Sequence, residues 1–280
     1  MSGPGTDRDR GPRRTPGAEI ARAIRPGPWF LGLVAVAGLG AWLAAGAGFD
    51  DTSARARGGV ALLVLAGWVI SLCAHEFAHA VTAFRFGDRG VETKGYLTLN
   101  PARYAHPGLS LVLPLLIILL GGIGFPGGAV YLDERGFTRA QRTAVSLAGP
   151  AANLVIGAAL LAAIEVFAPQ TADGDFRPDD TINLWGGLAM LAFLQLTAAV
   201  LNLIPMPGFD GYGAIEPYLS PQMRARAATI APFGFLIVFA LLFIPALNDA
   251  FFDLVFGLFA LSGVPSPLLA WGWNTFLFWR

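Results

Sequence analysis

The sequence contains little charge and almost no cysteine. Only 14% of its 280 residues are charged, and acidic and basic residues balance to a net charge of zero, so nothing indicates binding of nucleic acid. A single cysteine, Cys73, excludes a disulfide within the chain. Because 55% of the residues are hydrophobic, the composition is too apolar for a soluble domain of this length and is typical of a helical membrane protein.

Histidine is scarce as well, and two of the three histidines lie four residues apart inside the apolar segment 58–86. His75 and His79 at this spacing share one face of a helix, so that two imidazole nitrogens can converge on one metal ion. Glu76 lies roughly a quarter-turn away, where it can reach a water molecule at that ion rather than the ion itself. The segment therefore predicts a His-Glu-x-x-His metal site within a membrane helix.

A purely structural role is the alternative for this motif, because a lone histidine in an apolar helix is usually a hydrogen-bonded core residue. Three ionisable residues within five positions are different, since each charged side chain near the bilayer centre costs about 2.5–3.5 kcal/mol on insertion scales. Ser71 and Thr82 extend the polar stripe on the same side of the helix. The pattern favours a functional site.

The remaining apolar runs predict an all-α polytopic membrane protein with about six transmembrane helices. Residues 1–27 are rich in Gly, Pro and Arg and predict a disordered basic tail in the cytoplasm. The run 28–49 predicts the first span, with a cleaved signal peptide as the alternative. Crossings after residue 248 cannot be assigned. The other predicted spans are residues 58–86, 143–167, 182–204 and 229–247.

Two stretches do not fit a plain helical span. Residues 91–99 alternate in polarity and predict a short β element near the surface. The apolar run 109–120 has only twelve residues, contains Pro114 and leads into a glycine-rich stretch. Because the arginines at 135–142 should again be cytoplasmic, we predict that residues 109–130 form a re-entrant segment rather than a full span.

A third metal ligand is needed, because catalytic zinc sites use three protein ligands and keep one position for water. Asp210 follows a helix broken by Pro205 and Pro207, and the adjacent Gly211 lets the backbone turn sharply. In the predicted topology this helix and the motif helix run in the same direction across the membrane, so Asp210 and the two histidines can meet at a similar depth. An ordinary loop turn is the alternative for Asp-Gly, and His106 is a weaker candidate ligand.

Together these motifs resemble the site-2 protease family of intramembrane metalloproteases. The resemblance covers about residues 60–215, and the chain is similar to compact members of the family because it carries no PDZ or CBS domain. Two further segments resemble parts of the family pattern, namely Gly149-Pro150-Ala151-Ala152-Asn153 and Leu99-Asn100-Pro101. The principal motifs are, in chain order, His75-Glu76-Phe77-Ala78-His79, Asn202-Leu203-Ile204-Pro205 and Asp210-Gly211.

The resemblance implies one zinc ion per chain, held by His75, His79 and Asp210, with Glu76 as general base. It implies a membrane-embedded metalloprotease domain at residues 28–280, and the active site lies toward the cytoplasmic side of the cell membrane in the predicted topology. The expected substrate is a single-span membrane protein, such as an anti-sigma factor or another membrane-tethered regulator, cut in or near its transmembrane segment. The core of the domain is expected at residues 58–215.

A donor for the developing oxyanion could come from Asn153 or Asn202, two asparagines in apolar helices, or from His106 in a loop. Hydrogen bonding between helices is the alternative for both asparagines. The predicted strand at 91–99 could offer an edge on which an unwound substrate adds a strand.

Two other classes of protein remain open at this point. A metal ion or proton transporter could also carry these residues, although such proteins usually show internal repeats, which we do not find in this sequence. A protease-like scaffold that binds membrane segments without cutting them is the second alternative.

Overall fold

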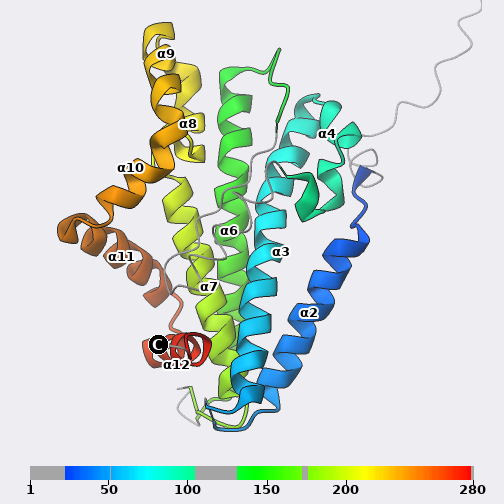
Figure 1. Cartoon of the computed structure of the whole chain (residues 1–280), viewed down its shortest axis with the longest axis vertical. Coiled ribbons are helices and arrows are strands. Elements are labelled where there is room, and N and C mark those ends of the chain that lie inside the picture. The colour runs from blue at the N-terminus through cyan, green and yellow to red at the C-terminus, as the bar shows by residue number, and fades with distance from the viewer. Residues whose placement is uncertain (1–22, 51, 105–130, 172–175, 279–280) are drawn as a thin grey trace, which may run out of the picture.

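A computed structural model describes residues 23–50, 52–104, 131–171 and 176–278, and these residues are helical apart from connecting loops and one isolated bridge between Gln170 and Phe176. The predicted all-α class is confirmed for this part of the chain (Figure 1). The longer helices are α2 (Pro28–Ala45), α3 (Ala54–Phe86), α6 (Arg139–Phe167), α7 (Ile182–Asn202), α9 (Pro221–Ile230), α10 (Gly234–Leu241), α11 (Pro245–Ala260) and α12 (Ser266–Phe276). The short ones are α4 (Gly90–Thr93), α8 (Asp210–Ile215), η1 (Tyr96–Thr98), η2 (Pro101–Arg103), η4 (Glu216–Tyr218) and η5 (Ala231–Phe233).

Helices α3, α6 and α7 form the centre of the bundle, with α2 packed along the outer side of α3 (Figure 1). Small residues allow α2 and α3 to approach closely, since a Cβ on Gly40 would lie 2.4 Å from the backbone nitrogen of Leu63. In the most apolar 18-residue stretch of α7, 78% of the residues are buried inside the protein. In that of α2, only 11% are buried. Helix α7 is therefore the core helix, and α2 presents its apolar side chains outward.

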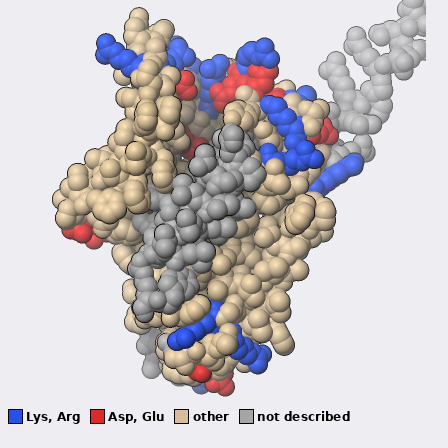
Figure 2. Space-filling model, viewed as in Figure 1, with Lys and Arg blue, Asp and Glu red and all other residues tan. Residues whose placement is uncertain are grey.

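Within the described part of the chain, five helical stretches are long and apolar enough to cross a membrane. Large apolar side chains on α2 face outward, and Trp29 and Trp42 are 69% and 64% exposed. On the face shown in Figure 2, most charged side chains gather at the two ends of the molecule, and few lie on the part between them. This distribution is that of a membrane protein. The five stretches are Pro28–Ala45, Ala54–Phe86, Arg139–Phe167, Ile182–Asn202 and Pro221–Leu241.

The segment for which the sequence predicts re-entry, residues 109–130, lies outside the described residues, and so does His106. The helices on either side of it are described. Helix α3 ends and α6 begins at the same end of the bundle (Figure 1), as the distribution of basic residues predicts.

The predicted strand at residues 91–99 is wrong, because these residues form α4 and the 3-10 turn η1. Tyr96 and Leu97 are adjacent and both buried, at 6% and 1% exposure, unlike neighbouring residues of a surface strand with one face in solvent. Gly95 and Leu99 adopt left-handed backbone angles, with φ of 76° and 55°, and interrupt any extended run. These residues therefore offer no strand edge to a substrate.

The end of the predicted N-terminal tail contacts this same turn. The backbone nitrogen of Gly27 donates to the Thr98 carbonyl at 2.8 Å, and that of Arg25 donates to the Leu97 carbonyl at 3.3 Å. Residues 25–27 therefore belong to the folded domain, while residues 1–22 lie outside the described part of the chain.

Candidate metal centre

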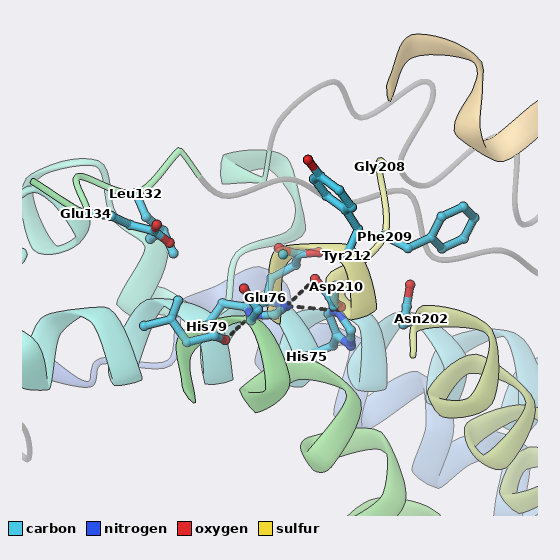
Figure 3. A pocket seen from close by; sticks show the side chains of 13 residues that line it. His75, Glu76, His79, Leu132, Glu134, Asn202, Gly208, Phe209, Asp210 and Tyr212 are labelled. Atoms are coloured by element: carbon cyan, nitrogen blue, oxygen red, sulfur yellow. Dashed lines mark hydrogen bonds and ion pairs between the residues drawn. The ribbon is translucent and has the colours of Figure 1, made fainter. Parts of the chain in front are cut away.

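The motif helix α3 presents its two histidines toward α6 and α8. His75, Glu76 and His79 are buried, with 3%, 2% and 6% exposure. The Nε2 atoms of the two imidazoles lie 3.1 Å apart, because a spacing of four residues places both side chains on one face. The predicted convergence of the two rings is thus present in the structure (Figure 3).

Asp210 reaches the histidine pair from α8, of which it is the first residue. Its Oδ2 lies 3.2 Å from Nε2 of His75, and its Oδ1 lies 3.3 Å from Nε2 of His79. Helix α7 ends at Asn202, and the chain then reverses through a segment in which Gly208 has φ of 102°. Residues far apart in the sequence are in this way brought to one point.

The structure assigns Gly211 a different role from the one that the sequence indicates. The left-handed residue of this turn is Gly208, and Gly211 lies within α8. A Cβ on Gly211 would lie 2.2 Å from the carbonyl oxygen of Leu203, so this glycine lets α8 pack against the end of α7. Its small size, rather than its backbone freedom, holds Asp210 in place.

The donor set and its spacing fit a zinc ion. Ligands at 2.0–2.1 Å from zinc in tetrahedral geometry lie about 3.3 Å from one another, close to the 3.1–3.3 Å separations of the two Nε2 atoms and the nearest Asp210 oxygens. A Cβ on Gly149 of α6 would lie 2.3 Å from Nε2 of His79 and 2.5 Å from Nε2 of His75. Only a residue without a side chain leaves room for an ion there.

Protonation in the cluster also suits metal binding. Nδ1 of His79 lies 2.7 Å from the carbonyl oxygen of Val145. Since a carbonyl only accepts, Nδ1 carries the proton and the lone pair of Nε2 faces the cluster. The Asp210 carboxylate supplies the anionic oxygen atoms of the donor set, 3.2 Å and 3.3 Å from the two Nε2 atoms.

A cavity of about 260 Å³ opens beside the cluster. Glu76 lines it, as does Asn202, whose Nδ2 is buried and has no hydrogen-bond partner among the described residues. Burial raises the pKa of the Glu134 carboxyl at the cavity wall. The charge of Arg142, whose Nε lies 3.9 Å from Oε2 of Glu134, lowers this pKa but does not cancel the effect of burial. The other lining residues are His75, His79, Leu132, Val145, Ser146, Gly208, Phe209, Asp210, Tyr212 and Gly213 (Figure 3).

The structure separates the three candidate oxyanion donors. Asn202 lines the large cavity, whereas Asn153 lines a small cavity on the other side of His75, and His106 lies outside the described residues. Sequence reasoning missed Glu134 and Gln195. A lone glutamine in the apolar helix α7 is a signal that could have directed attention to Gln195, whereas Glu134 gives no such signal.

Residues 131–134, two of which line the cavity, are held to the end of α3 by Asp88. This carboxylate is buried, at 5% exposure, and accepts 2.8 Å hydrogen bonds from the backbone nitrogens of Gly90 and Asp133. Nζ of Lys94 also donates to the Tyr131 carbonyl. Asp88 is thus the link between the motif helix and one wall of the cavity.

We expect Asp88→Ala to lower the cleavage of a peptide substrate several-fold while zinc content stays unchanged. The variant loses both bonds to the carboxylate, each worth about 1.5–3 kcal/mol, and frees residues 131–134 from α3. Asp133→Ala is the matched control, because it removes an exposed ion pair with Arg135 and keeps the backbone donor to Asp88. Equal activity of the two variants would contradict the proposed link.

The fold and the cluster define a membrane-embedded metalloenzyme of the His-Glu-x-x-His class. Comparison with known proteins agrees. Rip2 of Mycolicibacterium smegmatis, whose name assigns it provisionally as a zinc metalloprotease, is 52% identical to this chain over 93% of the chain and 96% of that protein. Rip2 of Mycobacterium tuberculosis is 49% identical over 92% and 95%, and YwhC of Bacillus subtilis is 32% identical over 65% and 80%, and both have names of the same kind.

The chain therefore belongs to the site-2 protease family of zinc metalloproteases, as its motifs predict, and zinc is its cofactor. No family model matches the sequence, and no solved structure matches it.

Proposed function

We propose that this protein is an intramembrane zinc protease that hydrolyses a peptide bond in or near the transmembrane segment of a single-span membrane protein, such as an anti-sigma factor or another membrane-tethered regulator. One observation carries the proposal. Two buried imidazoles and a carboxylate converge within 4.8 Å of one another beside a buried glutamate, in a bundle whose outer surface is apolar. Such a cluster is costly within a membrane and is typical of catalysis there.

We assign zinc binding to His75, His79 and Asp210. When bound, zinc supplies Lewis-acid chemistry, polarising a carbonyl and lowering the pKa of water at the site. The Val145 carbonyl fixes the ring of His79 through its Nδ1 proton, and Asp210 supplies the negative charge of the ligand set. These three residues hold the site in a fixed geometry between α3, α6 and α8.

Glu76 acts as the general base and then as the general acid. It lines the cavity next to the ligands, accepts a proton from the attacking water and passes that proton to the nitrogen of the leaving amine. Asn202 lines the same cavity. Its Nδ2, which has no hydrogen-bond partner in the described ranges, is a suitable donor to the oxyanion that develops on the scissile carbonyl. Asn153 does not suit this role, because it lines a different cavity.

We further propose that the chain is a multi-pass protein of the cell membrane, with its N-terminus and the metal site toward the cytoplasm and a catalytic core at residues 58–215. The basic residues at the end where α3 stops and α6 starts support this orientation. They are Arg85, Arg89, Lys94, Arg135, Arg139 and Arg142. The opposite end carries Asp50, Asp179 and Asp180 together with Arg55, Arg57 and Arg177.

Removal and return of zinc tests this function. The purified protein is placed in liposomes with a single-span reporter whose transmembrane segment contains a helix-breaking Gly-Pro pair, since only unwound backbone exposes its peptide bonds. We expect a chelator to slow cleavage on the order of 10²-fold or more, because Lewis-acid stabilisation is worth several kcal/mol, and zinc to restore it. Mass spectrometry should place the cut within or beside the span.

A parallel assay in the same liposomes measures zinc uptake. Transport of zinc without any cleavage would overturn the assignment in favour of a transporter. Zinc binding with neither activity would favour a scaffold.

A further inference from the structure

Behind His75, on the side away from Asp210, three buried polar atoms lack a hydrogen-bond partner among the described residues. They are Nδ1 of His75, Oδ1 of Asn153 and Oε1 of Gln195. The three side chains are 3%, 3% and 1% exposed. They line a cavity of about 10 Å³, together with Trp68, Ser71, Leu72 and Ala198.

The two metal-site histidines differ in their outer contacts. His79 donates from Nδ1 to the Val145 carbonyl, which fixes its ring. An Nε2 atom that binds zinc gives its lone pair to the ion, so the neutral ring of His75 would carry its proton on Nδ1, which needs an acceptor. Histidines that bind metals almost always donate this second N–H, and an unmade bond at a buried donor costs about 1–3 kcal/mol.

A chain of hydrogen bonds fixes which atom of Gln195 faces the cavity. The hydroxyl of Ser71 donates to the Trp68 carbonyl at 2.8 Å, so its oxygen can only accept from the glutamine. Nε2 of Gln195 donates to that oxygen at 2.8 Å. The carbonyl oxygen Oε1 is therefore left as an acceptor, like Oδ1 of Asn153.

We propose that one buried water molecule occupies this cavity, accepts the Nδ1 proton of His75 and donates its own two protons to Asn153 and Gln195. The hydrogen bonds balance. A water molecule has lone pairs to accept from Nδ1 of His75 and two protons to donate to the oxygens of Asn153 and Gln195. The volume corresponds to about one water molecule. Asn153 and Gln195 are thus positioning residues, which hold the ring of His75 through this water.

The proposal rests on zinc binding by His75, and zinc affinity measured by competition with a chelator tests it. We expect Asn153→Leu and Gln195→Met each to weaken zinc binding about 10- to 100-fold, the usual effect of removing an outer partner of a ligand. Because both residues hold the same water, the double variant should bind zinc no more weakly than the weaker single variant. Additive losses would overturn the shared water.

Conservative and control variants separate positioning from a general loss of structure. Asn153→Asp keeps an oxygen at the same place and should bind zinc as the wild type does, with the wild-type absorption spectrum after replacement of zinc by Co²⁺. Thr197→Val is the control for a buried polar residue of α7 outside the cavity, since its hydroxyl donates to the Phe193 carbonyl of the same helix. It should leave zinc affinity unchanged.

Wild-type affinity in both apolar variants would overturn the inference, as would equal losses in Asn153→Asp and Asn153→Leu. A wild-type protein that binds no zinc would instead overturn the proposed function. If neither apolar variant folds, an experimental structure of the wild type decides: density for a water within hydrogen-bond distance of Nδ1 of His75 supports the inference, and a dry cavity overturns it.

Discussion

Glu76→Gln is expected to lower the cleavage rate of a membrane substrate by about 10²–10⁴-fold, the usual contribution of a general acid–base residue. The amide has nearly the same size as the carboxyl and cannot accept a proton at neutral pH. Because Glu76 is not among the three grouped ligands, zinc content should stay at one ion per chain. Cleavage kinetics and metal analysis on the same preparation measure both quantities.

The control for this variant is Glu92→Gln, which makes the same chemical change at an exposed residue of α4. It should cleave at the wild-type rate. Substantial cleavage by Glu76→Gln at one zinc ion per chain would show that another group in the cavity transfers the proton. Loss of zinc from Glu76→Gln would indicate that Glu76 supports the metal directly.

Helical periodicity accounts for what the sequence predicts well. A spacing of four residues is enough to place His75 and His79 together, and their Nε2 atoms lie 3.1 Å apart. Asp210 is predicted on other grounds, namely the helix break before it and the resemblance to the family pattern. The structure places Asp210 beside both histidines, but Gly211 is not the residue at which the chain turns. Local sequence does not reveal that a Cβ on Gly211 would lie 2.2 Å from the Leu203 carbonyl oxygen.

The wrong prediction of a strand at residues 91–99 also arises because local sequence does not reveal neighbours in space. Alternation of polarity over a few residues predicts a strand with one buried and one exposed face. Burial of both Tyr96 and Leu97 depends on contacts with elements far away in the sequence, and tertiary packing overrides local preference. The role of Gln195 depends likewise on its neighbours in space, Ser71 and His75, which periodicity on α7 cannot supply.

Gly149→Ala is expected to weaken zinc binding about 10- to 100-fold, and cleavage should fall with it. The added methyl group would lie 2.3 Å and 2.5 Å from the Nε2 atoms of His79 and His75, where the ion must be held. Overpacking of a buried site costs about 1–3 kcal/mol, and each 1.4 kcal/mol corresponds to a tenfold change in affinity. Competition with a chelator measures the zinc affinity, and thermal unfolding of the zinc-free protein reports on the fold.

Gly187→Ala provides the matched control, because it adds the same methyl group at another buried helix interface. Its nearest neighbour would be the flexible Leu63 side chain at 3.1 Å, which can move aside. At Gly149 the neighbours are the ligand atoms themselves, so relief of the clash requires the rings to leave the metal. A loss of zinc confined to Gly149→Ala would therefore locate the ion against α6. Wild-type zinc affinity in that variant would contradict the prediction, because it would mean that the ion is not held against Gly149.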